Sequence, residues 1–355
     1  MKIAFVGRYE QGEILSGPGK VAARLFEEAC RKHDAEFITY FFDGRKHSRQ
    51  EKFFGRHEFH EGSGRVLMMG IIPMLRHLQR TSPDVIHIIS FERFASALKY
   101  VKPLVRSKFV YTVHGIAAME NERFRHAPED YAKRDSAAES SLFAFCDKIA
   151  FLSKQTLDIA KATYGIDGSR CTIVPNGIDA EFNSTNLRKA HGNELKLVFT
   201  GDPERREKGF EVLTTALELL DLPYTLYVVT DSIAVSGRNI VVQRRMCAKG
   251  LAEFYSDKDI FISSSIYEPF SMSATEAMAS GVACIASDST GMTRYIRDGV
   301  NGFIFPSGDP SALAKVIARL NSERDLLASV ANEGRKIPGI LGWDKVFAAY
   351  ESLYL

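Results

Sequence analysis

The sequence predicts an α/β fold made of two Rossmann-like domains, each built on a mainly parallel sheet. Short β-branched and aromatic runs alternate with amphipathic stretches along most of the chain, which is the pattern of βαβ crossovers. The alternation is interrupted by a polar stretch at residues 183–194 and then restarts. A chain of 355 residues is also long enough for two domains of roughly 150–180 residues each.

The first half opens with an expected strand, KIAFVG (2–7), and an expected amphipathic helix, KVAARLFEEACRK (20–32). The strands that we expect to follow are all rich in Val, Ile, Phe and Tyr. They are residues 35–42, 84–90, 108–115, 148–153 and 171–175.

The second half repeats this alternation and ends in an amphipathic helix at about 343–355, after a break at Pro338 and Gly339. Ligands of doubly wound sheets bind beyond the carboxyl ends of the strands, so we expect a site in the strand-to-helix turns. The expected strands are residues 196–201, 225–230, 239–243, 259–265 and 282–287, and the expected helices are 209–220, 249–256 and 272–280.

Composition excludes several classes of protein. With 45% hydrophobic and 25% charged residues, the chain is not mainly disordered, collagen-like or stapled by disulfides. The 46 Lys and Arg residues nearly balance 44 Asp and Glu residues, so no overall charge points to a nucleic-acid partner. The five cysteines form no CxxC pair, and no run of about 18 apolar residues occurs. We therefore expect a cytoplasmic protein without a membrane-spanning segment.

The turn TGDPERREKG (200–209) is the first candidate for chemistry. An expected strand ends at Gly201, and Arg205, Arg206 and Lys208 precede the helix that begins near Gly209. Cations beside a helix N-terminus suit a diphosphate. A solvated basic loop is the alternative for such a turn on its own.

The segment YEPFSMSATEAMASG (267–281) is the second candidate. Glu268 falls in the turn after a strand, and Glu276 falls on the helix that follows. One carboxylate could bind a sugar and the other a ribose diol, while the amides of Ser271 and Met272 bind a phosphate between them. The alternative is an ordinary helix with one acidic residue in its first turns.

Several motifs in order resemble a known family, the retaining GT-B glycosyltransferases of family 4 (glycosyl transferases group 1), over nearly the whole chain. The spacing of Glu268 and Glu276 matches the family's E-x7-E motif. The other matching segments are SGPG (16–19), TVHG (112–115), IVPNGIDAEF (173–182), KG (208–209) and IRDGVNGFIFPSGD (296–309).

The resemblance implies a GT-B fold with an acceptor-binding domain at 1–182 and a donor-binding domain at 183–340, facing each other across a cleft. A helix at 341–355 would return to the first domain. It also implies metal-independent hexosyl transfer, with retention, from a UDP- or GDP-sugar to a glycan, lipid or small-molecule acceptor. No cofactor is implied.

The resemblance also assigns donor-binding roles residue by residue. Lys208 would bind the diphosphate with help from Arg206, although Asp202 stands where the family commonly has its arginine. Glu276 would bind the ribose, and Met246 lies where the family often contacts the base. Glu268 would lie beside the sugar, with the backbone of Phe270, Ser271 and Met272 near its hydroxyls and phosphate.

Other motif positions carry implied roles or depart from the family's pattern. His114 would lie near the transferred sugar and the acceptor, so that Glu268, His114 and Lys208 are the expected catalytic residues. Gly17 and Gly19 would allow the backbone to approach a phosphate. Ser271 replaces a frequent glycine of the family, and Thr290–Arg294 replaces its later glycine-pair and glutamate element.

Other sequence patterns give only weak support for other functions. Asp257-Lys258-Asp259 matches a metal-binding DxD motif but precedes an expected strand, so we interpret it as a strand entry. His57-Glu58-Phe59-His60 is not an HExxH metal motif, and no GxGxxG follows the first strand. Epimerases and phosphorylases share the fold, and a non-catalytic protein that binds sugar nucleotides is the remaining alternative function.

Residues 44–108 carry 13 Lys and Arg residues but only five Asp and Glu residues, with apolar residues between them. One interpretation is a peripheral contact with an anionic membrane, on its inner, cytoplasmic face, or with an anionic acceptor. The other is a solvated loop followed by an amphipathic core helix.

Overall fold

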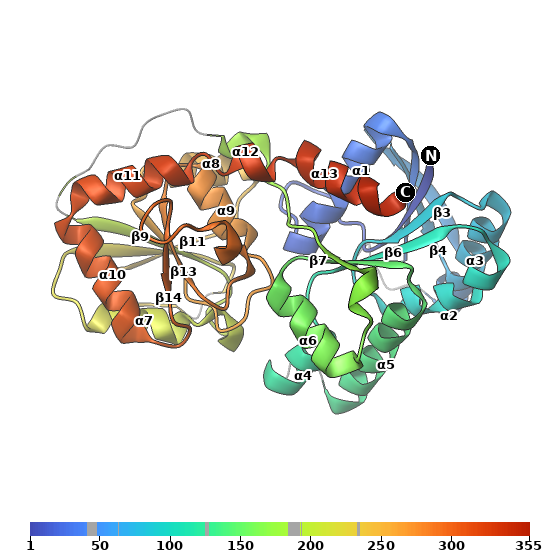
Figure 1. The fold of residues 1–355 in the computed structure, drawn as a ribbon, viewed down its shortest axis with the longest axis horizontal. Coiled ribbons are helices and arrows are strands. Elements are labelled where there is room, and N and C mark those ends of the chain that lie inside the picture. Colours follow the sequence, from blue (N-terminus) through green and yellow to red (C-terminus); the bar gives the residue numbers. More distant parts are fainter. Residues whose placement is uncertain (41–47, 63, 125–127, 184–191, 193, 233–234) are drawn as a thin grey trace. The chain divides into compact units, whose positions relative to one another are not determined.

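The computed structural model describes residues 1–355 except 41–47, 63, 125–127, 184–191, 193 and 233–234 (Figure 1). It confirms the expected α/β fold with two Rossmann-like sheets. The chain divides into two compact units after Pro175 and after Gly342. Unit 1 comprises Met1–Pro175 with Trp343–Leu355, and unit 2 comprises Asn176–Gly342.

Unit 1 contains an eight-stranded sheet that is parallel except for one edge pair. The exception is the hairpin of β3 and β4, which turns at Gly62, a residue with a φ of +58°. The sequence pattern did not predict this hairpin, because β3 (RHEFHE) is charged and largely exposed. In spatial order the strands are β3 (Arg56–Glu61), β4 (Gly64–Met69), β2 (Asp34–Thr39), β1 (Lys2–Gly7), β5 (Val85–Ile88), β6 (Lys108–Val113), β7 (Lys148–Phe151) and β8 (Cys171–Ile173).

Serine caps begin several helices of unit 1. The Ser16 hydroxyl accepts from the amide of Gly19, and the Ser153 hydroxyl accepts from the amide of Thr156. The helices of this unit are α1 (Gly17–Lys32), α2 (Arg49–Phe54), α3 (Ile71–Thr81), α4 (Ala117–Phe124), α5 (Glu129–Phe145), α6 (Lys154–Tyr164) and α13 (Trp343–Tyr354), with the 3-10 helix η1 at Arg93–Tyr100.

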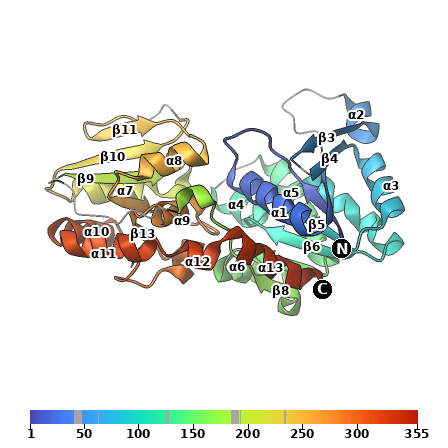
Figure 2. The ribbon, with the colours of Figure 1, turned by 90° about the horizontal axis from the view of Figure 1, so that it is seen from above.

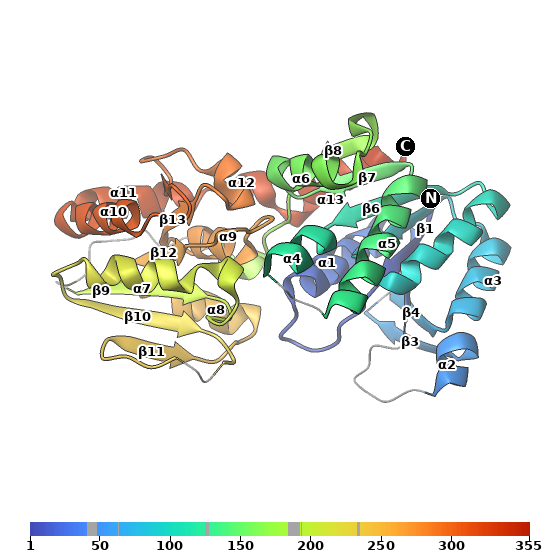
Figure 3. The same ribbon diagram turned by 90° about the horizontal axis from the view of Figure 1, so that it is seen from below.

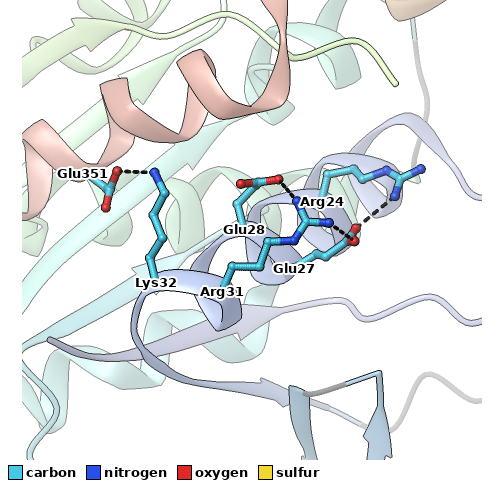
Figure 4. Close-up of polar contacts among 6 residues, drawn as sticks. All are labelled: Arg24, Glu27, Glu28, Arg31, Lys32 and Glu351. Atoms are coloured by element: carbon cyan, nitrogen blue, oxygen red, sulfur yellow. Dashed lines mark hydrogen bonds and ion pairs between the residues drawn. The ribbon is translucent and has the colours of Figure 1, made fainter. Parts of the chain in front are cut away.

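The C-terminal helix α13 packs on α1, so both chain ends lie in unit 1 (Figures 1 and 2). Glu351 accepts from Lys32 Nζ at 3.0 Å (Figure 4). Its carboxylate also lies 2.8 Å from the Nε2 atom of His33. Neighbouring ion pairs on α1, such as Arg24–Glu27 at 2.9 Å, are exposed and stabilise the helix only slightly. Because exposed ion pairs contribute little, α13 is attached to unit 1 mainly through its buried face.

That buried face joins a polar network inside unit 1. His87 of β5 is fully buried, and its two ring nitrogens hydrogen-bond to the hydroxyls of Tyr354 and Thr112 at 2.8 Å. Thr112 in turn donates to the Tyr350 hydroxyl at 3.2 Å. Because burial disfavours the charged ring, the pKa of His87 falls from 6.5 to about 3. The network therefore holds a neutral histidine at neutral pH.

Unit 2 contains a six-stranded sheet in which all neighbours are parallel, so all its strands have their carboxyl ends at one edge. In spatial order the strands are β11 (Ile240–Gln243), β10 (Tyr224–Val229), β9 (Leu195–Thr200), β12 (Ile260–Ser263), β13 (Ala283–Ser287) and β14 (Phe303–Phe305). The helices are α7 (Phe210–Glu218), α8 (Ala248–Tyr255), α9 (Met272–Ala279), α10 (Pro310–Ser322), α11 (Arg324–Gly334) and α12 (Pro338–Leu341).

Helices cover the unit 2 sheet as the sequence pattern predicts. Helix α9 packs on β12, β13 and α8, and α7 packs on α10. Helices α10 and α11 lie toward β14 and β13, far from the edge strand β11 (Figures 2 and 3). Sequence order reverses between β9 and β12 in this sheet, and between β1 and β5 in the unit 1 sheet. Such switch points are where doubly wound sheets bind ligands.

The basic segment of the first half is only partly described. Arg45 and Lys46 lie outside the described residues. Helix α3 buries Met74 and Leu78, while Phe54 and Tyr100 are exposed. Within the part of the chain that the structure describes, we find no helix with the length and apolar character that crossing a bilayer requires.

We expect acid to destabilise unit 1 through His87. The unfolded ring ionises near 6.5 and the folded ring near 3, so stability is lost as the pH falls below 6.5. At pH 5 the loss from this one ring is about 2 kcal/mol. Urea unfolding followed by fluorescence of Trp343, the single tryptophan, should show that His87→Gln loses about 2 kcal/mol less than the parent between pH 8 and pH 5.

The matched control is His60→Gln, which changes an exposed histidine of β3. It should follow the parent at both pH values. An equal loss of stability in the His87 variant and in the parent would contradict the assignment.

Candidate active site

Lys208 and Glu268 meet at the switch point of the unit 2 sheet. Lys208 lies in the turn after β9, Glu268 lies in the turn after β12, and Lys208 Nζ is 2.5 Å from Glu268 Oε2. Both side chains are partly exposed, at 24% and 16%. The two turns that the sequence singled out thus form one site.

Gly209 sets the distance between these two turns. Its φ is +64°, and a Cβ atom placed there would lie 2.0 Å from the Ser264 carbonyl oxygen. Only glycine fits such a position, because any side chain would overlap the neighbouring backbone. Across the same contact, the amide of Ile266 donates to the Glu207 carbonyl oxygen at 2.8 Å. Lys208 is therefore carried on backbone that is fixed against the end of β12.

The turn at Glu268 is held from its other side by the segment that follows β13. The Glu268 amide donates to the Ser289 carbonyl oxygen at 3.2 Å, and the Gly291 amide donates to the Glu268 carbonyl oxygen at 2.8 Å. The Met292 amide donates to the Phe270 carbonyl oxygen at 2.9 Å. The segment Thr290–Arg294, which departs from the family motif, thus supports the site through its backbone.

Ser271 begins helix α9 in a left-handed conformation, with φ and ψ both at 81°. This conformation explains why glycine is frequent here in the family that the sequence resembles. The Ser271 hydroxyl accepts from the Ala274 amide at 3.4 Å, whereas the amides of Met272 and Ser273 precede the first intrahelical bond. These first-turn amides can bind an anion beside Lys208.

Glu276 lies further along α9 and is 4% exposed. It lies close to Tyr255 of α8: burial, together with the neighbouring Glu276 charge, raises the Tyr255 pKa well above its usual 10. Met246 is half-buried in the loop before α8 and lies against Gly250. Both residues therefore lie near α8, Glu276 by Tyr255 at its end and Met246 against Gly250 near its start.

The other cations of the first turn differ in their availability. Arg205 forms an ion pair with the buried carboxylate of Glu207. Arg206 is exposed, and its guanidinium group has no hydrogen bond or ion pair within the described part of the chain. Among the three cations of this turn, Arg206 is thus the one that remains unpaired, as an accessory phosphate ligand requires.

His114 belongs to unit 1 and lies directly after β6. Its Nε2–H donates to the Ile89 carbonyl oxygen at 2.8 Å, which leaves Nδ1 as an acceptor, because a carbonyl oxygen cannot donate. Burial lowers the pKa of the ring from 6.5 to about 4, against the opposing effect of this hydrogen bond. His114 is therefore neutral at neutral pH and can accept a proton from a hydroxyl group.

Glu139 fixes the turn that carries His114. This fully buried carboxylate of α5 accepts from the amides of Ala117 and Ala118, at 3.0 and 3.3 Å, and from the Tyr164 hydroxyl at 2.6 Å. It thereby satisfies the start of α4. No local motif marks Glu139, since it acts on residues more than twenty positions away, and the sequence analysis missed it.

Gly17 is exposed at the start of α1, whereas Gly19 is buried. A Cβ atom at Gly19 would lie 2.4 Å from the Glu10 carboxylate, which also accepts from the Ser16 amide and hydroxyl at 2.7 Å each. Glu10, a second residue that the sequence analysis missed, therefore explains why Gly19 is small. Both glycines belong to unit 1, whereas Lys208 belongs to unit 2.

The acidic motif Asp257-Lys258-Asp259 lies at the amino end of β12, at the opposite edge from Lys208 and Glu268. Asp257 pairs with Lys196 Nζ at 2.8 Å, and Asp259 accepts from the Lys196 amide at 2.8 Å. Lys258 lies over the rings of Tyr227 and Phe254. In the ranges that the structure describes, no three His, Cys, Asp or Glu side chains come together as metal ligands.

Two protein-family models match the chain. One, described as Glycosyltransferase Family 4, covers residues 15–182, and the other, Glycosyl transferases group 1, covers residues 184–337. A putative glycosyltransferase EpsD of Bacillus subtilis is 25% identical over 65% of this chain and 65% of its own. A D-inositol 3-phosphate glycosyltransferase of Paenarthrobacter aurescens is 23% identical over 67% of this chain and 64% of its own. The chain thus spans slightly less than two thirds of the length of both relatives.

Solved structures share the fold across almost the whole chain. Sucrose-phosphate synthase from Thermosynechococcus elongatus superposes with a TM-score of 0.77 at 16% identity, covering 99% of this chain and 98% of that one. Anabaena Alr3699/HepE, in complex with UDP and glucose, gives 0.71 at 17% identity with the same coverage. At these identities the likeness shows the fold.

We expect Gly209→Ala to destabilise unit 2 by about 3 kcal/mol or more, since backbone strain adds to overlap with Ser264. The matched control is Gly308→Ala, because Gly308 also has a positive φ, +78°, but has no neighbour within 4 Å of the added methyl group. That variant should lose about 1–2 kcal/mol from strain alone. Urea unfolding followed by circular dichroism compares the two, and equal losses would mean that the close approach is not a constraint.

Proposed function

Because the chain belongs to the glycosyl transferases group 1, within glycosyltransferase family 4, we propose that it transfers a hexose, with retention, from a UDP- or GDP-sugar to a glycan, lipid or small-molecule acceptor. The observation that carries this proposal is the Lys208–Glu268 pair beside the first turn of α9. A cation, a carboxylate and free helix amides together offer one partner for each part of a nucleotide sugar.

The diphosphate of the donor binds Lys208 and the amides of Met272 and Ser273, with Arg206 as an accessory cation. When the bond between the sugar and the diphosphate breaks, these groups stabilise the negative charge on the leaving diphosphate. Once the donor is bound, these groups already face the diphosphate, so little further reorganisation is needed when the bond breaks.

Glu268 exchanges its partner when the donor binds. In the free protein its carboxylate compensates Lys208 at 2.5 Å. A diphosphate draws Lys208 to itself, and Glu268 then accepts hydrogen bonds from sugar hydroxyls. The backbone at Phe270 and Ser271 lines the same turn.

The remaining residues with proposed roles contact the nucleoside of the donor, a sugar hydroxyl group or a phosphate. Glu276 accepts the ribose hydroxyls, and Met246 packs on the base. His114 accepts a hydroxyl of the transferred sugar or the acceptor through Nδ1, in keeping with its neutral ring. Gly17, exposed at the start of α1, leaves room for a phosphate to approach that backbone.

The names of related proteins support the proposed substrate classes. Alr3699/HepE has been solved with UDP-glucose, and relatives include D-inositol 3-phosphate glycosyltransferases and a phosphatidyl-myo-inositol mannosyltransferase of Mycobacterium leprae. These names cover a UDP-hexose donor and both soluble and lipid acceptors. We assign the donor to residues 183–340 and the acceptor to residues 1–182, with the helix at 341–355 serving the latter.

Location and partners follow from the same proposal. We assign the protein to the cytoplasm, where nucleotide sugars are made available, with the basic residues of 44–108 toward an anionic acceptor or an anionic membrane surface. A non-catalytic sugar-nucleotide binder is the second candidate function. It is separated from the first by whether bound donor is turned over.

Lys208→Ala should lower kcat/KM for the nucleotide sugar at least about thirtyfold. This fall corresponds to a loss of about 2–4 kcal/mol of transition-state stabilisation. Release of the nucleoside diphosphate measures this loss. The matched control is Lys196→Ala, which removes a lysine with an acidic partner from the opposite end of β9. Unchanged kcat/KM in a folded Lys208 variant would remove the phosphate assignment.

Turnover should persist in EDTA, because Lys208 and the α9 amides supply the positive charge that a metal ion would otherwise supply. Asp257→Asn should retain activity as well, since that carboxylate belongs to ion pairs at the other edge of the sheet. Abolition of turnover by EDTA, with recovery in Mg²⁺ or Mn²⁺, would show that the proposed metal independence is wrong.

A further inference from the structure

The switch point of the unit 1 sheet carries the same pair of charges as that of unit 2. In unit 2, Lys208 follows β9 and Glu268 follows β12, the two strands between which sequence order reverses. In unit 1 the corresponding strands are β1 and β5, and they are followed by Arg8 and Glu92. The position at which such sheets bind ligands therefore carries a cation and a carboxylate in both units.

The chain around Glu92 is fixed on two sides. The Ile89 amide donates to the Val6 carbonyl oxygen of β1 at 3.0 Å, and the Ile89 carbonyl oxygen accepts from His114 at 2.8 Å. Glu92 itself precedes η1 as its cap residue, but its side chain makes no capping bond. The backbone three residues before Glu92 is thus tied to His114, and the Glu92 side chain does not cap η1.

Glu92 differs from Glu268 in having no partner. It is half-buried, and no described residue gives its carboxyl group a hydrogen bond or an ion pair. The nearby guanidinium groups are committed elsewhere: Arg8 lies 3.6 Å from Glu10, and Arg93 lies 3.3 Å from Asp135. Glu10 also holds the Ser16 turn. The carboxyl group of Glu92 is therefore available to accept hydrogen bonds from a ligand.

The charges around Glu92 indicate what kind of ligand fits. Burial raises its pKa from 4.5 to about 7, Arg8 and Arg93 oppose this rise, and Asp135 and Glu10 add to it. Two cations and two other carboxylates nearly cancel, so the surroundings favour neither an anion nor a cation. A neutral hydroxyl group can donate to the ionised carboxylate without adding charge.

We propose that Glu92 binds a hydroxyl group of a sugar or polyol acceptor. The proposal rests on the proposed function, since it assigns an acceptor to the same transfer reaction. Ionised Glu92 accepts the hydroxyl proton in a hydrogen bond, and protonation of Glu92 removes that acceptor atom. Acceptor use should therefore weaken as the pH falls through about 7, the value to which its pKa is raised.

The test compares the parent with Glu92→Gln and Glu92→Asp. The donor is whichever of UDP-glucose and GDP-mannose the parent hydrolyses, and the acceptors are D-glucose, D-inositol 3-phosphate and octyl β-D-glucoside. In Glu92→Gln the acceptor KM should rise about tenfold or more, and the fall in kcat/KM between pH 8 and pH 6 should disappear. Glu92→Asp should raise KM but keep a pH-dependent profile.

Two measurements separate this role from a structural one. Donor affinity should stay within about twofold of the parent in both variants, because the change leaves unit 2 unaltered. Glu27→Gln, an exposed carboxylate on α1 (Figure 4), should behave as the parent in every assay. Thermal unfolding confirms that each variant is folded.

The outcomes distinguish this proposal from the proposed function. A parent protein that neither binds nor hydrolyses any nucleotide sugar would overturn the proposed function. A parent that hydrolyses donor but transfers to none of the three acceptors would overturn the assignment of Glu92 alone. So would a Glu92→Gln variant with the parent's acceptor KM, or one with a raised KM and an unchanged pH profile.

Discussion

The close approach of Gly209 to the Ser264 carbonyl oxygen is the constraint on which the unit 2 site depends. It brings the turn after β9 against the end of β12, so that Lys208 and Glu268 meet at 2.5 Å. Backbone hydrogen bonds from Ile266 and to Ser289 then fix both turns. The first turn of α9 begins only four residues after Glu268, so its amides are positioned by the same turn.

In the free protein, the negative charge of Glu268 compensates the positive charge of Lys208. Lys208 and Glu268 are partly withdrawn from water, and each would be costly to hold there alone. Paired with each other, they compensate this cost, and in the proposed function a donor then offers a phosphate to Lys208 and hydroxyls to Glu268. The unit 1 edge is built differently: His114 is neutral through burial, and among the described residues Glu92 has no hydrogen-bond or ion-pair partner for its carboxyl group. The unit 2 edge thus holds a pair of opposite charges, whereas at the unit 1 edge His114 is neutral and the pKa of Glu92 is raised to about 7.

Local patterns predicted much of this architecture. Both unit 2 turns were recognisable because each lies within about fifteen residues and joins a strand to a helix. The role of Asp257 as part of a strand entry could be predicted from its side of β12. The hairpin of β3 and β4 was missed, since the exposed charged residues of β3 carry no hydrophobic pattern. Contacts such as Glu139 with Ala117, or His87 with Tyr354, join distant segments and leave no local signal.

In the proposed function, Lys208 binds phosphate while Glu268 binds sugar, and the two side chains compensate each other's charge until a donor binds. Calorimetric titration of Glu268→Gln with UDP and with UDP-glucose, or with GDP and a GDP-hexose, separates these roles. Affinity for the free nucleotide should be unchanged or increased, because Lys208 has lost its partner, while the extra affinity contributed by the sugar should fall. Equal weakening of both ligands would show that this division of roles is wrong.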